Sequence, residues 1–542
     1  MADLGALLAD PRHPGWGDPP LPDWIQVLRP AQRTAIAEAA EAFERGVKPV
    51  RIVVVSAPTG SGKTVIGECV RRLLGVRGRY VCVDKGLQDQ VLRDFPYAAV
   101  LKGRSNYPTL DFPARYAPPE RLSCEDCTAD PPGTPGCMWC GDVRGCPYKV
   151  AKAAARIADL AVLNTAYFLA EANTGGAFSG SDFVVADECD RLEGSLMSYV
   201  TVTVGRRRLE GWGVDPLPGG SPAPEAAAWA DLVASRAEGD VEALLARDPE
   251  ALDLRTQREL RALRRLRADL RRVVGELDDG GWVTTQVKGA VEFKPVRVAA
   301  ADAEIALWRH ADKWLLMSAT VLSAGDMLRD LGVLDPWSWA EVDLPSPFPA
   351  ANRPIHLLGV TNVVRANPGA PEIVAAALRR VLARHSEDRV LVHTVSFKLQ
   401  AELERRLPPS PRYVWYRGAG DRAAVLRDYL GRPGAVLFAP ALERGVDLPD
   451  EACRAIVVCK VPWPDLGDAQ VAARARGAGG DSWYRRQALR SLVQMTGRGV
   501  RHEADVCATY VLDRQADRIV SQGRRDLPRW WCEAVVIGAD GI

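Results

Sequence analysis

A glycine-rich segment, APTGSGKT at 57–64, directly follows the β-branched run RIVVVS at 51–56 and leads into a stretch with helical spacing. A strand, a glycine turn and a helix in this order offer a phosphate chain close backbone N–H groups, a helix N-terminus, a lysine charge and a hydroxyl for Mg²⁺. The segment therefore predicts a nucleotide site on a parallel sheet with helices on its faces. The residues assigned to this site are Ala57, where the usual pattern has glycine, and Gly60, Ser61, Gly62, Lys63 and Thr64.

Strand-like and helix-like segments alternate over most of the chain. The first block of this pattern is interrupted twice, by a Pro-, Gly- and Cys-rich stretch at 105–147 and by a longer stretch at about 195–300. A second block begins after the proline-rich link SPFPAANRP at 346–354. Such alternation predicts parallel sheets, so we expect an α/β protein with two sheet domains and two insertions in the first.

The bulk composition excludes several classes of protein. With 47% hydrophobic and 26% charged residues, the 542-residue chain has the composition of an ordinary soluble globular protein. It has no run of about 20 apolar residues and no export signal, so we expect no membrane segment and a reducing cytoplasm, where disulfides are rare. Because the net charge is only +1, any nucleic acid must be contacted through local grooves or stripes.

Two further segments carry side chains suited to phosphate hydrolysis. Asp187 and Glu188 end the apolar run DFVVA, where one carboxylate can hold Mg²⁺ and the next can orient and deprotonate a water. In the second block, QMTGRGVR at 494–501 places Arg498 and Arg501 on one face of a helix, and such guanidiniums suit the charge that develops on a γ-phosphate. Read alone, each segment has a plain alternative: a surface acidic pair, or a helix with salt-bridged arginines.

Taken in order, the segments APTGSGKT, DECD, MSAT, ALERGVDLP and QMTGRGVR resemble the motifs of superfamily 2 helicases, and more narrowly those of the XPD/DinG-type branch of 5′→3′ DNA helicases. The resemblance covers nearly the whole chain from residue 29 onward, and compact length and Ala/Arg-rich composition suggest a bacterial or phage member. Further segments that are similar to that branch are RPAQ at 29–32, LQDQ at 87–90, KGRSNYP at 102–108, CPY at 146–148, SPF at 346–348, CKVPWPDLGD at 459–468 and LPRWW at 527–531.

The resemblance implies two RecA-like motor domains that bind ATP and Mg²⁺ between them. We expect a first motor domain at 1–104, 151–194 and 301–345, a Cys-rich insert at 105–150, a helical arch insert at 195–300 and a second motor domain at 346–542. It also implies residue roles. Mg²⁺ would be held by Thr64 and Asp187, Glu188 would activate water, and Ser318-Ala319-Thr320 would link the ATP site to domain movement. The other residues that it assigns to the nucleotide are Arg29 and Gln32 for the adenine, Gly445 and Asp447 across the cleft, and Gln494, Arg498 and Arg501 from the second domain.

The sequence departs from the family pattern in three places. The box that usually reads Asp-Glu-Ala-His ends here in Cys189-Asp190, so Asp190 must couple hydrolysis to strand binding differently from the usual histidine. The usual Asn-His before that box is Asn164-Thr165. The position that normally supplies the first cluster cysteine is Thr109.

Five cysteines lie close together in the first insertion: Cys124, Cys127, Cys137, Cys140 and Cys146. By spacing alone, two CxxC pairs are typical of a zinc ribbon. The resemblance favours a [4Fe–4S] cluster instead, because CPY at 146–148 is similar to the last ligand segment of the family's cluster domain. Either group takes four thiolates. We therefore expect four of the five to bind a cluster, with Zn²⁺ as the alternative.

The resemblance implies an ATP-dependent DNA helicase that translocates on single-stranded DNA, unwinds tailed or forked duplex DNA and acts as a monomer. Alternatives are a DNA-stimulated translocase or remodeller, a zinc-bearing nucleic-acid-binding protein with a weak motor, and an RNA helicase. In the second insertion, a leucine stripe from Leu260 to Leu277 predicts an amphipathic helix. Its arginines are either a solvated face or a phosphate-contacting stripe. The candidate DNA contacts are Arg104, Asn106, Tyr107, Arg264 and Arg271.

Overall fold

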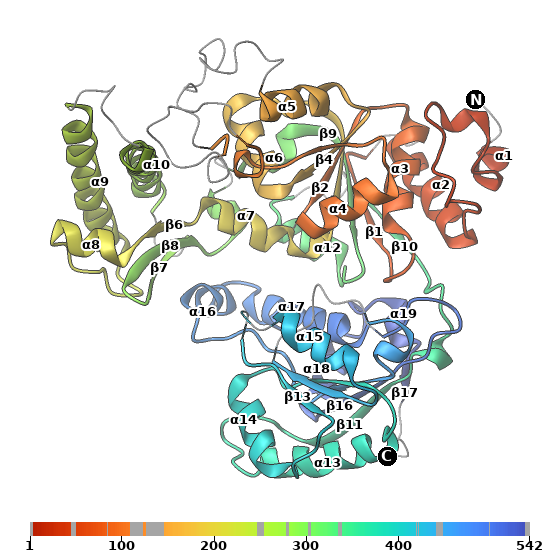
Figure 1. Cartoon of the computed structure of the whole chain (residues 1–542). Coiled ribbons are helices and arrows are strands. Elements are labelled where there is room, and N and C mark those ends of the chain that lie inside the picture. Colours follow the sequence, from red (N-terminus) through yellow and green to blue (C-terminus); the bar gives the residue numbers. More distant parts are fainter. Residues whose placement is uncertain are drawn as a thin grey trace.

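The computed structural model describes residues 4–44, 50–83, 85–108, 123–125, 146–246, 254–277, 281–301, 305–333, 339–418, 420, 422–440, 448–497 and 499–536. Two α/β domains lie one above the other, and a helical projection extends from the side of the first (Figure 1). Within these ranges no helix is both long enough and apolar enough to span a membrane.

The first domain is built on seven parallel strands in the order β10-β1-β9-β5-β2-β4-β3. Both faces of β1 are buried, which explains why its sequence is an unbroken apolar run. The strands of the first domain are β1 (Ile52–Ser56), β2 (Gly78–Cys82), β3 (Ala99–Leu101), β4 (Leu160–Asn164), β5 (Ser181–Asp187), β9 (Ala311–Ser318) and β10 (Trp339–Asp343). Its helices are α1 (Leu4–Ala9), α2 (Pro30–Glu44), α3 (Lys63–Leu74), α4 (Lys85–Asp94), α5 (Pro147–Ile157), α6 (Thr165–Ala170), α7 (Leu192–Val200) and α12 (Ala324–Asp330).

The second domain has its own sheet of seven parallel strands, in the order β13-β14-β12-β15-β16-β11-β17. Its strands are β11 (Ile355–Thr361), β12 (Val390–His393), β13 (Tyr413–Trp415), β14 (Val436–Ala439), β15 (Ala455–Val458), β16 (Ala508–Asp513) and β17 (Val535–Val536). Its helices are α13 (Ala370–Arg384), α14 (Phe397–Arg406), α15 (Arg422–Gly431), α16 (Ala469–Arg476), α17 (Gly480–Thr496), α18 (Gln515–Gln522) and α19 (Arg529–Cys532). The predicted α/β class with two parallel-sheet domains is confirmed.

The projection in Figure 1 is the second insertion, and it is only partly helical. Helices α8 (Arg206–Trp212), α9 (Ala223–Leu245) and α10 (Leu254–Glu276) stand on a three-stranded antiparallel sheet of β6 (Val202–Val204), β8 (Ala290–Pro295) and β7 (Trp282–Val287). The predicted leucine stripe packs against α9, with Leu263, Leu270 and Val273 almost fully buried. The sheet was not predicted. Lys288 and Gly289 join β7 to β8, and both have positive φ, as a two-residue type I′ hairpin turn requires.

Candidate nucleotide site and interdomain groove

The phosphate loop lies between the end of β1 and the start of α3, as its motif predicts. Gly60 and Gly62 have φ values of +79° and +78°, a left-handed conformation that glycine adopts without strain. Gln32 supports the loop from α2, because its side-chain amide donates to the Ser61 carbonyl at 2.9 Å and leaves no room for a Cβ on Gly62. The Arg29 guanidinium donates to the Gly60 carbonyl at 2.7 Å. These contacts hold the loop through two of its carbonyl oxygens.

The carboxyl end of β5 brings the predicted metal-binding residues together. Tyr80 on the neighbouring strand β2 donates its phenol to Asp187 Oδ2 at 2.9 Å, and the Thr64 hydroxyl lies beside the same phenol. Burial and the Asp187 carboxylate raise the pKa of Tyr80, so the phenol stays protonated and remains a donor. Thr64 and Asp187 therefore present oxygen atoms of the kind that Mg²⁺ prefers. Glu188 follows in a left-handed conformation, φ 52°, which turns the chain at this point.

Asp190 connects this edge of the first domain to the second domain. Its buried carboxylate accepts one hydrogen bond from the Ser318 hydroxyl at 2.7 Å and another from the Gln494 amide at 2.9 Å. The same amide also donates to the Thr320 hydroxyl at 3.1 Å. Asp190 thus takes the position of the usual histidine as an acceptor shared by the two domains. The Asn164 side chain caps α6 by accepting from the Tyr167 N–H at 2.7 Å.

The segment that carries Arg501 approaches the phosphate loop with its backbone. The Arg501 carbonyl oxygen lies 3.7 Å from the position that a Cβ on Gly60 would take. The buried carboxylate of Asp505 holds this segment by accepting from the backbone N–H groups of Arg501 at 3.0 Å and Asp450 at 3.2 Å. Gly445, Asp447 and Arg498, which were also assigned to the nucleotide, lie outside the described residues.

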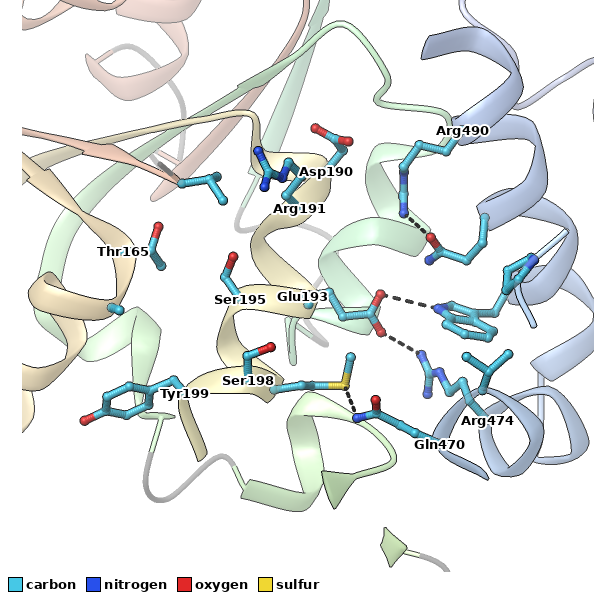
Figure 2. A pocket seen from close by; sticks show the side chains of 18 of the residues that line it. Thr165, Asp190, Arg191, Glu193, Ser195, Ser198, Tyr199, Gln470, Arg474 and Arg490 are labelled. Atoms are coloured by element: carbon cyan, nitrogen blue, oxygen red, sulfur yellow. Dashed lines mark hydrogen bonds and ion pairs between the residues drawn. The ribbon is translucent and has the colours of Figure 1, made fainter. Parts of the chain in front are cut away.

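A groove of about 910 Å³ lies between the domains, next to Asp190 (Figure 2). Its polar lining includes Thr165, Arg191, Ser195, Ser198 and Tyr199 from the first domain, and Gln470, Arg474 and Arg490 from the second domain. Four basic residues, Lys85, Arg191, Arg474 and Arg490, and two acidic residues, Asp190 and Glu193, line it. The groove is therefore locally positive, although the chain as a whole is close to neutral.

Ion pairs that are at least partly buried join the two domains, and two of their members, Glu193 and Arg474, also line the groove. Arg474 of α16 pairs with Glu193 at 3.6 Å and with Asp330, and Arg486 of α17 pairs with Asp326 at 3.0 Å and Asp330 at 3.3 Å. Burial and the nearby Asp330 raise the pKa of Glu193. Because buried charges are unfavourable without partners, these contacts define one particular arrangement of the domains.

In the Cys-rich insert, the structure describes two of the five cysteines. Cys124 and Cys146 are both buried, with their sulfur atoms 4.0 Å apart. Burial and the neighbouring Cys146 raise the pKa of the Cys124 thiol to about 11, and a metal cation that replaces the proton would stabilise the thiolate. The donor set therefore fits a thiolate-bound metal. Cys127, Cys137, Cys140 and Thr109 lie outside the described residues.

The predicted DNA-contacting residues lie in the segment 104–107 and on α10. Asn106 is exposed and accepts from the Lys85 ammonium at 2.9 Å, whereas Tyr107 is half-buried and packs edge-on against Tyr148. The Arg104 guanidinium lies over the Tyr148 ring at 5.2 Å.

On α10, Arg264 is exposed, and Arg271 is also exposed but pairs with Glu238 of α9. The groove itself was not predicted, because apart from Asn164, Thr165, Asp190 and Pro464 its lining residues lie outside the motif segments and meet only when the domains pack.

The second domain matches a known protein family in sequence. Residues 379–534 match the family model described as a helicase C-terminal domain. Human regulator of telomere elongation helicase 1 is 28% identical over 166 residues, which are 26% of this chain and 13% of that protein. The Caenorhabditis elegans ATP-dependent DNA helicase chl-1 is 30% identical over 107 residues, 18% of this chain and 12% of that protein. The matched stretch therefore spans only a small part of these relatives.

Solved structures share the fold over almost the whole chain. An XPD helicase superposes with a TM-score of 0.63 at 14% identity, covering 94% of this chain and 99% of that chain. The structure of S. tokodaii Xpd4 gives a TM-score of 0.56 at 13% identity, covering 91% of this chain and 97% of that chain. Both sheets therefore belong to RecA-like domains. The second domain thus matches a helicase C-terminal domain in sequence, and the chain as a whole shares the fold of solved XPD helicases.

Proposed function

We propose that the protein is an ATP-dependent DNA helicase that moves 5′→3′ along single-stranded DNA and separates tailed or forked duplexes. The observation that carries the proposal is the contact at Asp190, two residues after Glu188, where Gln494 of the second domain binds a carboxylate of the first. A hydrolytic site that touches both domains must change when the domains move, and a motor needs such a link.

In this proposal ATP binds at the phosphate loop. The N–H groups of the loop and the Lys63 ammonium hold the phosphates, while Thr64 and Asp187 would hold Mg²⁺, which neutralises phosphate charge when bound. Glu188 accepts the proton of the attacking water. The remaining assignments are Arg29 and Gln32 at the adenine, Gly445 and Asp447 across the cleft, and Arg498 and Arg501 at the γ-phosphate.

The single-stranded DNA would run through the interdomain groove. Lys85, Arg191 and Arg490 offer positive charge to a phosphodiester backbone there, and the Ser195 and Ser198 hydroxyls offer hydrogen bonds. Contacts with the backbone alone carry no sequence information, so we expect binding without strong sequence preference. Because the groove is shared by both domains and borders Asp190, movement of the strand and the state of the nucleotide site are linked.

Cys124 and Cys146 would hold the metal group of the first insert. The family resemblance favours a [4Fe–4S] cluster with two more of the five cysteines. The 4.0 Å sulfur separation also suits two ligands of one tetrahedral zinc, for which Zn–S bonds of about 2.3 Å give a separation of about 3.8 Å. When bound, either group would fix loops that bury little apolar surface.

Lys63→Ala tests the proposed activity. We expect DNA-stimulated ATP hydrolysis to fall at least about a hundredfold, because the phosphates lose their positive partner, and unwinding of a 5′-tailed duplex to be lost. A 3′-tailed duplex measures direction, and RNA in place of DNA measures strand preference. DNA-stimulated hydrolysis by the unaltered protein without unwinding of any tailed duplex would instead identify a translocase. Unchanged hydrolysis in Lys63→Ala would contradict the proposal.

Asp190→Ala tests the link between the domains. The substitution leaves Gln494 and Ser318 without their shared acceptor, so we expect the number of base pairs unwound per ATP hydrolysed to fall by about tenfold. Asp190→Asn is the matched variant, because its amide oxygen can take the place of only one of the two carboxylate oxygens as an acceptor. Its coupling ratio should lie between those of the unaltered protein and Asp190→Ala. Equal coupling ratios in all three proteins, measured from parallel ATPase and unwinding rates, would show that Asp190 does not couple the domains.

A further inference from the structure

Phe348 belongs to the second domain but touches the phosphate loop of the first. Its side chain is 5% exposed and packs in the second domain's core with residues such as Ile355 and Trp530. A Cβ built on Gly60 would lie only 2.7 Å and 2.8 Å from two carbon atoms of the Phe348 ring. Gly60 therefore has to be glycine for two reasons, its positive φ and the ring that covers one side of it.

The backbone of Phe348 is fixed from both sides. Its N–H donates to the Ser346 hydroxyl at 3.1 Å, and its carbonyl accepts from Arg353 Nε at 3.2 Å. The same guanidinium donates to the Trp530 carbonyl and lies over the Trp530 ring at 5.8 Å. The backbone of Phe348 therefore cannot move relative to α19 without breaking these contacts.

From α19 the contacts continue to the segment that carries the arginines. The Trp531 indole N–H donates to the Thr496 hydroxyl at 2.7 Å, at the last residue of α17, and a Cβ on Gly497 would touch the Trp530 ring at 3.5 Å. A small cavity of about 30 Å³ is lined by Pro58 and Thr59 on one side and by residues of the second domain, including Phe348, Thr496, Gly497, Gly499 and Val500. Packed residues thus connect Gly60 with Thr496 and Gly497 by a route that does not pass through Asp190.

We propose that Phe348 is a positioning residue of the nucleotide site, which holds the phosphate loop in register with the end of α17 at Thr496 and Gly497 through its contact with Gly60. This inference rests on the proposed binding of ATP at the loop. Nucleotide phosphates need the loop N–H groups in one arrangement, and the Phe348 ring limits where Gly60 can lie. The position of the second domain therefore affects nucleotide binding directly, as well as the hydrolysis step.

Phe348→Ala in the full-length protein tests the proposal. We expect the Kd for a fluorescent ADP analogue and the KM for ATP to rise by about tenfold, which corresponds to about 1.4 kcal/mol, with kcat also reduced. Phe348→Leu retains part of the ring volume and should restore part of the affinity. Phe397→Ala removes an aromatic ring that is 53% exposed on α14, and it serves as the matched control.

A merely structural role predicts a different result: the melting temperature falls, but the folded fraction binds the ADP analogue with unchanged Kd. That outcome overturns the inference, provided that Lys63→Ala weakens binding in the same assay. If Lys63→Ala binds the analogue normally, the proposed nucleotide site itself fails, and the inference fails with it.

The direct contact is tested by combining Phe348→Ala with Gly60→Ala. Gly60→Ala places a methyl group against the ring in addition to its backbone strain, so its effect on the Kd should be several-fold smaller once the ring is absent. Residues in contact show this departure from additivity, whereas independent sites do not. Additive effects on the Kd would show that the ring does not act through Gly60.

Discussion

Replacing Glu188 with glutamine is expected to lower DNA-stimulated ATP hydrolysis by at least about a hundredfold, because an amide of the same shape cannot take a proton from water. Nucleotide binding should persist, since the loop residues and Asp187 are unchanged. Steady-state hydrolysis with saturating single-stranded DNA measures the first quantity, and titration with a fluorescent nucleotide measures the second.

Two further variants separate the role of Glu188 from a general effect of lost charge. Asp187→Asn should weaken nucleotide binding as well as turnover, because Asp187 would hold Mg²⁺ and receives the Tyr80 hydrogen bond. Glu210→Gln, on the exposed face of α8, should leave both unchanged. Full turnover in Glu188→Gln would assign the base to another residue.

The position and shape of the phosphate loop could be predicted because their information is local. A strand, a glycine turn and a helix follow one another within the chain, and the positive φ values of Gly60 and Gly62 are already implied by the residue type. The leucine stripe of α10 was predictable for the same reason, since helical spacing selects one face. The hairpin between β7 and β8 also had a local signal at Lys288 and Gly289, but it lay between segments expected to be helical.

The interdomain contacts could not be predicted, because they depend on how two separately folded sheets pack. Nothing local to Asp190 indicates that its carboxylate is shared between Ser318 and Gln494. Glu193 and Arg474 lie far apart in the sequence and outside any motif, yet they form a buried ion pair. Family resemblance indicated where the usual histidine was missing, but only the arrangement of the domains showed which groups bind the aspartate in its place.

Cys124→Ser and Cys146→Ser should each abolish the metal content of the protein, whereas Cys532→Ser, a half-buried thiol in the second domain, should not. A metal group held by four thiolates loses most of its binding energy when one ligand is removed. Iron and zinc analysis together with the visible absorbance of the purified variants measures the loss independently of activity. Iron with a broad visible absorbance identifies a cluster, and one zinc per chain without colour identifies the alternative.

We expect Cys124 to compensate for the missing ligand at position 109. The Pro108 carbonyl accepts from the Cys124 sulfur at 3.1 Å, and the Cys124 N–H donates to the Tyr107 carbonyl at 2.8 Å. Cys124 therefore lies directly beside the segment that leads into Thr109, so its thiolate can replace the one that the family places there. Thr109→Cys should then restore metal binding to Cys124→Ser but not to Cys146→Ser. Failure of that rescue, with both single variants metal-free, would show that Cys124 binds the metal at a position of its own.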